Sequence, residues 1–106
     1  MNKAMQMRNI QQTQGEGRVR FLHTSPDAPD IDIYINGQMH VKRLPFRVAS
    51  NYLPLKPGKY HIDIYPTGNS VDSVLNKKIT VEPGKSYTFA AINPVKKMRL
   101  LPYFNQ

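Results

Sequence analysis

The chain of 106 residues is long enough for one domain with a single modest core. It has no cysteine, which excludes disulfides, thiolate zinc sites and cysteine nucleophiles. Fifteen Lys and Arg against seven Asp and Glu give a net charge of +8. That charge favours polyanions, anionic surfaces or acidic partners, although it also serves solubility alone.

Residues 1–17 differ from the rest of the chain, because they are rich in Gln and Asn and end in Gly-Glu-Gly. Met5 and Met7 alternate as in a strand, but Ile10 breaks that phase, so neither periodicity is favoured. We expect an extended arm that is flexible or becomes ordered against a partner. The arm has no apolar stretch of signal-peptide length, so we expect cytoplasmic synthesis. No run in the chain approaches the roughly 20 apolar residues of a membrane helix, so no membrane span is expected.

From Arg18 onward, apolar residues recur at every second position, which is typical of β-strands. In the first expected strand, 18–24, Val19, Phe21 and His23 share one face. We therefore expect this face to be buried and the histidine ring to lie against the core.

The second expected strand, 30–35, has isoleucine at 31, 33 and 35, and alternates them with Asp32 and Tyr34. The Asn36-Gly37 pair that follows favours a two-residue hairpin turn, because both residues accept positive φ. Residues 38–44 are therefore expected to return as the partner strand. A shorter extended piece is expected over 47–53.

Four more strands are expected farther along the chain, and no segment of useful length has the apolar stripe of a helix. In the first of them, Ile62 and Ile64 point inward while His61, Asp63 and Tyr65 point outward. The pattern predicts an all-β sandwich of seven to eight short strands over residues 18–106. The four expected strands cover residues 59–66, 73–81, 85–93 and 98–104.

Two short sequences occur twice. Ile-Asp-Ile-Tyr stands at 31–34 and at 62–65, and Pro-Gly-Lys stands at 57–59 and at 83–85. Proline followed by glycine is typical of a type II turn, so both sites are expected to be hairpin turns or corners between sheets. The repeats fit an ancient duplication, and shared strand-and-turn sequence preferences explain them as well.

The stretches 19–37, 53–68 and 81–92 resemble the bacterial family of domains of unknown function DUF4397. The resemblance rests on His-x-Ser-Pro-Asp-Ala-Pro from His23, on Asn36-Gly37 after the second strand, and on the Pro-Gly-x-Tyr corner at 57–60. It extends over about residues 18–101. It implies an immunoglobulin-like antiparallel β-sandwich.

Many family members are exported or surface proteins, and versions without a signal peptide occur in spore-forming bacteria. For this chain the resemblance implies deposition on a spore or cell surface after cytoplasmic synthesis. The family has no agreed activity, so it assigns no catalytic residue here.

Three aspartates lie within six positions, at 27, 30 and 32. A calcium loop is one interpretation, but Pro26 and Pro29 stiffen the segment and no acid downstream closes it. The interpretation we favour is a structural loop, in which short polar side chains accept backbone N–H groups and a buried histidine holds the loop. The residues assigned to this structural loop are His23, Ser25, Asp27 and Asp32.

No residues are assigned to catalysis, to a metal or to a cofactor. A pairing of His23 with Ser25 and an aspartate is the enzymatic alternative, but no nucleophile elbow or oxyanion signature accompanies it. His23, His40 and His61 come from three different expected strands, and no close-spaced pair fixes two of them on one metal.

Basic residues occur along the whole chain, and exposed aromatic side chains beside them would suit nucleic acid or another polyanion. Tyr34 and Tyr65 are expected to point outward, although tyrosines on an open sheet face commonly pack with each other across strands. The residues proposed for polyanion binding are Arg18, Arg20, Lys96, Lys97 and Arg99.

Two functions are therefore expected. The first is a non-enzymatic structural or interaction module that forms a homo-oligomer, or joins a surface-layer protein, through residues 1–17 and its sheet edges. The second is a basic module that binds an anionic polymer such as a wall polymer, a glycan or nucleic acid.

Overall fold

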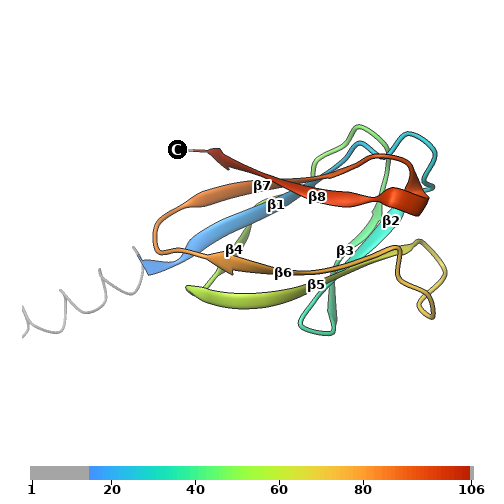
Figure 1. Ribbon diagram of the computed structural model, residues 1–106. Coiled ribbons are helices and arrows are strands. Elements are labelled where there is room, and N and C mark those ends of the chain that lie inside the picture. Colours follow the sequence, from blue (N-terminus) through green and yellow to red (C-terminus); the bar gives the residue numbers. More distant parts are fainter. Residues whose placement is uncertain (1–14, 106) are drawn as a thin grey trace, which may run out of the picture.

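A computed structural model describes residues 15–105 of the chain (Figure 1). Most of the expected N-terminal arm, residues 1–14, lies outside the described residues. The strands are β1 Gly17–His23, β2 Ile31–Ile35, β3 Gln38–Leu44, β4 Leu53–Leu55, β5 Gly58–Pro66, β6 Leu75–Val81, β7 Ser86–Ile92 and β8 Arg99–Asn105, with a 3₁₀ turn η1 at Val95–Lys97.

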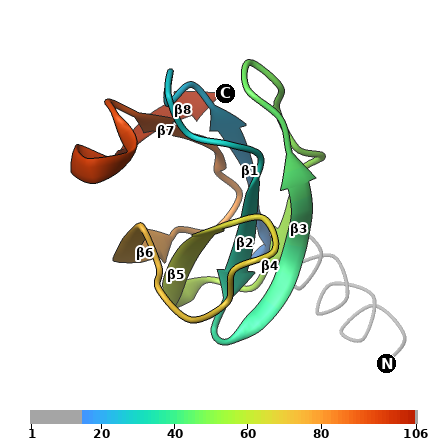
Figure 2. The same cartoon turned by 90° about the vertical axis from the view of Figure 1, so that its right-hand side faces the viewer.

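The strands form two four-stranded sheets, ordered β4-β1-β7-β8 and β3-β2-β5-β6. Figure 1 shows β7, β1 and β8 of the first sheet above β6 and β5 of the second, and Figure 2 shows the same arrangement after a turn of 90°. The predicted all-β sandwich of seven to eight strands is confirmed. One pairing departs from the expected antiparallel pattern: β1 runs parallel to β7, from Arg18 beside Ser86 to His23 beside Ala91.

The core lies between the sheets and contains the residues that alternate inward along each strand. Val19 and Phe21 of β1 are buried, and so are the isoleucines of β2. Ile62 and Ile64 of β5 have no exposed surface. Burying one such side chain contributes about 1.5–3 kcal/mol, so this alternation fixes which face of each strand turns inward.

The repeated Ile-Asp-Ile-Tyr segments lie side by side, because β2 and β5 are antiparallel neighbours. Tyr34 pairs with Asp63 and Asp32 pairs with Tyr65 across this ladder. The expected hairpin turn follows β2, with positive φ of 50° at Asn36 and 83° at Gly37.

Both Pro-Gly sites are corners between the sheets, since each joins a strand of one sheet to a strand of the other. At Pro83-Gly84 the glycine has φ of 71°, as a type II turn requires. The type II prediction is wrong at Pro57-Gly58, where φ of the glycine is 149°. Gly58 there already begins β5, so the chain bends directly into the strand.

The prediction of an extended piece over 47–53 is also wrong in its bounds. Arg47 has φ of 70°, which interrupts an extended chain. Residues 45–52 instead follow the edge of β1 irregularly, with a single bridge between Ala49 and Leu22, and β4 begins only at Leu53.

Within residues 15–105, no helix is long and apolar enough to cross a membrane.

Candidate functional site: a groove between two sheet edges

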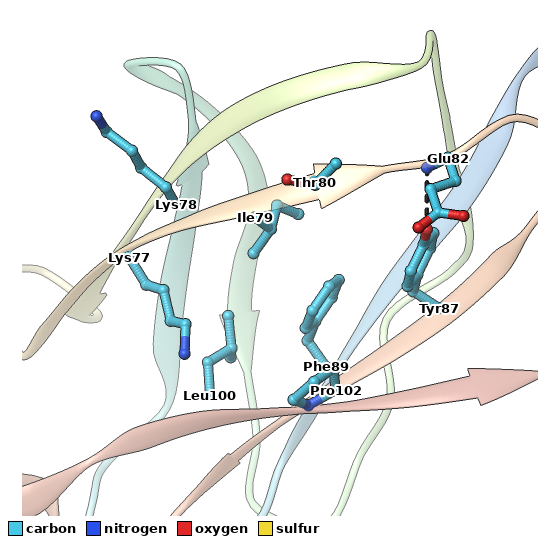
Figure 3. A pocket seen from close by; sticks show the side chains of 9 residues that line it. All are labelled: Lys77, Lys78, Ile79, Thr80, Glu82, Tyr87, Phe89, Leu100 and Pro102. Atoms are coloured by element: carbon cyan, nitrogen blue, oxygen red, sulfur yellow. Dashed lines mark hydrogen bonds between the residues drawn. The ribbon is translucent and has the colours of Figure 1, made fainter.

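An apolar groove of about 280 Å³ opens between β6 of one sheet and β7 and β8 of the other. Figure 3 shows Ile79 on one side of it, with Phe89 and Leu100 facing it from the other sheet. These three residues belong to the hydrophobic core, so the groove is an opening into the core. The remaining lining residues are Lys77, Lys78, Thr80, Glu82, Tyr87 and Pro102.

The groove exists because β6 and β8 are both edge strands, so no further strand closes the sandwich on this side. Its two ends carry different charged groups. Lys77 points down from β6 toward Leu100 at one end (Figure 3). At the other end Glu82 pairs with Lys85 at 3.0 Å, and its backbone N–H donates to the hydroxyl of Tyr87 at 2.9 Å.

The edges beside the groove carry residues that discourage pairing with another sheet. Pro102 in β8 has no N–H to offer a further strand, and Lys77 and Lys78 occupy β6. Beyond these lysines, the edge of β6 at 79–81 has neither proline nor charge.

The N-terminal segment joins the domain beside this groove. A side chain at Gly17 would meet Cγ1 of Val81 at 2.5 Å, so the backbone of β1 begins pressed against the end of β6. The N–H of Gly84 donates to the carbonyl of Glu16 at 3.2 Å. Residues before Gly15 are therefore connected to the domain at the end of the groove that carries Glu82.

At the opposite end of β1, His23 has no exposed surface and joins the loop that follows it. Its Nδ1 accepts the Ser25 N–H at 3.3 Å, and its Nε2 lies 2.9 Å from the carbonyl of Pro29. A carbonyl only accepts, so Nε2 carries the proton. Both ring nitrogens therefore bond to the backbone of the 24–30 loop.

Ser25 and Asp27 connect the same loop to the segment after β7. Oγ of the fully buried Ser25 donates to the carbonyl of Asn93 at 2.6 Å, and Oδ1 of Asp27 accepts the Val95 N–H at 2.8 Å. The Ser25 hydroxyl thus faces a carbonyl and does not donate to His23, so the two do not form a nucleophile and base pair as they stand.

Asp32 lies on the outer face of β2 and bonds to other segments. Its Oδ1 accepts the Arg43 N–H at 2.9 Å and the Thr67 hydroxyl at 2.8 Å. The carboxylates of Asp27 and Asp32 thus have separate partners. Among residues 15–105, no group of three or more His, Asp or Glu side chains is placed to hold a metal ion.

The five residues proposed for polyanion binding form two groups. Arg18 and Arg20 lie over one ring, with their guanidinium carbons 5.0 and 4.7 Å from the centroid of Tyr52. Their side chains also donate to hydroxyls of β7, to Ser86 at 3.0 Å and to Thr88 at 2.8 Å. The aromatic partner was missed in the sequence, because residue 52 lies more than thirty positions away from either arginine.

The second group lies toward the other end of the same sheet. Arg99 pairs with Ile92, the last residue of β7, whereas Arg18 lies beside Ser86, the first residue of that strand. Lys96 and Lys97 belong to η1, which is separated from the start of β8 by one residue. The structure therefore separates Lys96, Lys97 and Arg99 from the arginines above Tyr52.

Comparison with known proteins gives a family but no function. The family model described as "Domain of unknown function (DUF4397)" matches residues 17–106, which include the whole chain after the N-terminal arm. A search among curated proteins finds no match.

Proposed function

The chain belongs to the DUF4397 family of domains of unknown function, and we propose that it is a non-enzymatic interaction module that assembles with itself. In this proposal, residues 1–14 of one copy dock into the groove between β6 and β8 of a second copy. The groove is the observation that carries the proposal, because it is an apolar opening toward the core between two unpaired edges, beside the point where the arm joins the domain.

The dimensions support docking between copies. Fourteen extended residues reach up to about 46 Å, whereas the six residues 77–82 that border the groove extend for about 20 Å. The arm is therefore long enough to leave its own domain and cover the groove of a neighbour. Its sequence contains no proline, and Met5 and Met7 would place two flexible apolar side chains on one face.

The lysines and the proline limit how the arm binds. A long ladder along β6 or β8 is disfavoured by Lys77, Lys78 and Pro102. We therefore propose that burial of methionine side chains over Ile79, Phe89 and Leu100 supplies most of the affinity. Only the short edge at 79–81 remains for backbone pairing.

Light scattering tests this proposal. The intact chain is expected to form an oligomer, and the chain lacking residues 1–14 is expected to be a monomer. Met7→Glu should weaken the oligomer at least tenfold, since a carboxylate in an apolar groove costs more than about 1.4 kcal/mol.

Gln6→Glu is the matched control, because it adds the same charge on the other face of an extended arm. It should leave the oligomer within about threefold of the intact chain. Equal masses for intact and truncated protein would rule out assembly through the arm. Equal losses from Met7→Glu and Gln6→Glu would rule out docking of the methionine face.

Assembly of identical copies suits a layer on a spore or cell surface, and this is the setting we propose. It rests on the resemblance to family members in spore-forming bacteria.

A second candidate function is binding of an anionic polymer. It is favoured by Arg18 and Arg20, whose positions over the Tyr52 ring combine positive charge with an aromatic surface. We expect retention on heparin that decreases steeply as salt rises.

Charge-matched double variants test where the polymer binds. Arg18→Gln with Arg20→Gln should elute at lower salt than Lys96→Gln with Lys97→Gln, because only the first pair removes the two cations over the Tyr52 ring. Equal shifts would mean that net charge alone causes retention. No salt-sensitive retention of the intact chain would overturn the candidate function.

A further inference from the structure

The outer face of the β3-β2-β5-β6 sheet holds a shallow pocket of about 280 Å³ at an irregular point in β3. Ile31 pairs with Leu44 and Ile33 pairs with Val41, so two residues of β3, Lys42 and Arg43, lie opposite the single residue Asp32. This is a β-bulge, a device that redirects side chains and often lies beside binding sites. We call it the bulge pocket, and its lining includes Asp32, Tyr34, Met39, Lys42, Arg43 and Asn69.

Asp32 presents an unused acceptor to the bulge pocket. The residue is only 7% exposed, and both hydrogen bonds to its side chain, from the Arg43 N–H and from Thr67, go to Oδ1. Oδ2 accepts no hydrogen bond from the described residues. Every fully enclosed side-chain polar atom among them has a partner, so Oδ2 is within reach of solvent. A hydroxyl donor in the pocket would satisfy it.

Arg43 occupies a backbone conformation that suits glycine. Its φ is 56°, in the left-handed region that costs a residue with a side chain about 1–2 kcal/mol. The β-bulge enforces this conformation at Arg43, and strained residues of this kind cluster at ligand sites. Arg47, with φ of 70°, has the same residue type and the same strain, but it does not line the bulge pocket.

Tyr34 adds an aromatic wall. Its ring lies against that of Tyr65, with centroids 5.2 Å apart and planes at 72°, so the two rings hold each other in place. An aromatic face packs well against the C–H groups of a sugar ring, which has one apolar side and several hydroxyls. The volume of about 280 Å³ lies just below the range of drug-sized ligand sites, which suits a single ring.

We propose that the bulge pocket binds one sugar unit that carries an acidic group, such as a uronic acid within an acidic glycan. The sugar ring lies on Tyr34, one hydroxyl donates to Oδ2 of Asp32, and the acidic group pairs with Lys42 and Arg43. A polymer without hydroxyl donors leaves the Asp32 carboxylate opposed to its own negative charges, and a neutral sugar leaves the two cations unused. This inference rests on the polymer-binding function proposed above. It names the substrate class, and it adds on the other sheet a contact site separate from the arginines over Tyr52.

Binding of polygalacturonate, with dextran and polyphosphate as comparisons, tests the inference at about 0.15 M ionic strength. Polygalacturonate is expected to bind more tightly than either comparison polymer. Arg43→Gly should weaken that binding at least tenfold, which is the loss of one charge-assisted hydrogen bond. Tyr34→Leu should weaken it as well, because leucine keeps the apolar bulk and removes the flat ring.

Arg47→Gly is the matched control, since it removes the same charge from the same backbone conformation outside the pocket. It should change affinity less than about threefold. Both glycine variants should keep the fold, as judged by unchanged circular dichroism, because glycine accepts positive φ.

The outcomes separate the site from the function. If no anionic polymer binds to the intact chain, the polymer-binding function and the site both fail. If polygalacturonate binds but Arg43→Gly and Arg47→Gly weaken it equally or not at all, the site fails and the function stands. Equal affinity for polyphosphate or dextran overturns the assignment to acidic sugars.

Discussion

His23 shows how one residue can couple a strand to the loops at its end. The alternation of β1 places the His23 side chain on the buried face of the strand. Its ring bonds to the backbone of Ser25 and Pro29. Ser25 and Asp27 extend these bonds to Asn93 and Val95. The His-x-Ser-Pro-Asp stretch therefore fastens the end of β1 to the segment after β7.

Replacement of His23 should destabilise the whole domain. His23→Leu leaves the buried Ser25 N–H without its partner and removes the bond to the Pro29 carbonyl, so the free energy of unfolding should fall by about 2–4 kcal/mol. His40→Leu is the control, because His40 is exposed and its change should stay within about 0.5 kcal/mol. Urea denaturation measures both values. Equal, small losses would contradict a structural role for the His23 ring.

At the scale of the element, the residues that set what each sheet can bind lie at the irregular points and edges of strands. The bulge in β3 places two cations opposite one carboxylate, and Pro102 and Lys77 occupy the two edges that flank the groove. In the described domain we expect these edge residues to limit unwanted pairing between sheets. We propose that the arm binds at residues 79–81 of β6, where the edge carries neither proline nor charge.

Removal of the edge protection should cause aggregation. Pro102→Thr restores a backbone N–H in β8, and Lys77→Val removes the inward charge of β6. The double variant without residues 1–14 is expected to sediment as large particles on incubation, while the truncated parent stays monomeric. Leu101→Thr in the truncated parent is the control for β8, because Leu101 lies on the outer face. A double variant as soluble as its parent would show that these residues do not guard the edges.

At the scale of the molecule, the sequence predicts those parts of the fold that depend on residues close together in the chain. Alternation around Val19 and Ile62 identifies the buried faces, and Asn36-Gly37 identifies a hairpin, because both signals are local. The parallel pairing of β1 with β7 and the stacking of two arginines on Tyr52 could not be predicted, since they join residues far apart in the chain. The pocket at Asp32 depends on the β3 bulge, which leaves no clear trace in the alternation of 38–44.

The most direct test of the central claim is hydrogen exchange along β6 in the intact chain and in the chain lacking residues 1–14. If the arm docks between β6 and β8, peptides that contain Ile79–Val81 should exchange more slowly in the intact protein, and more so as protein concentration rises. Peptides from β3 and β4, on the other side of the sandwich, should be unchanged. Identical exchange at 79–81 in the two proteins would contradict the account.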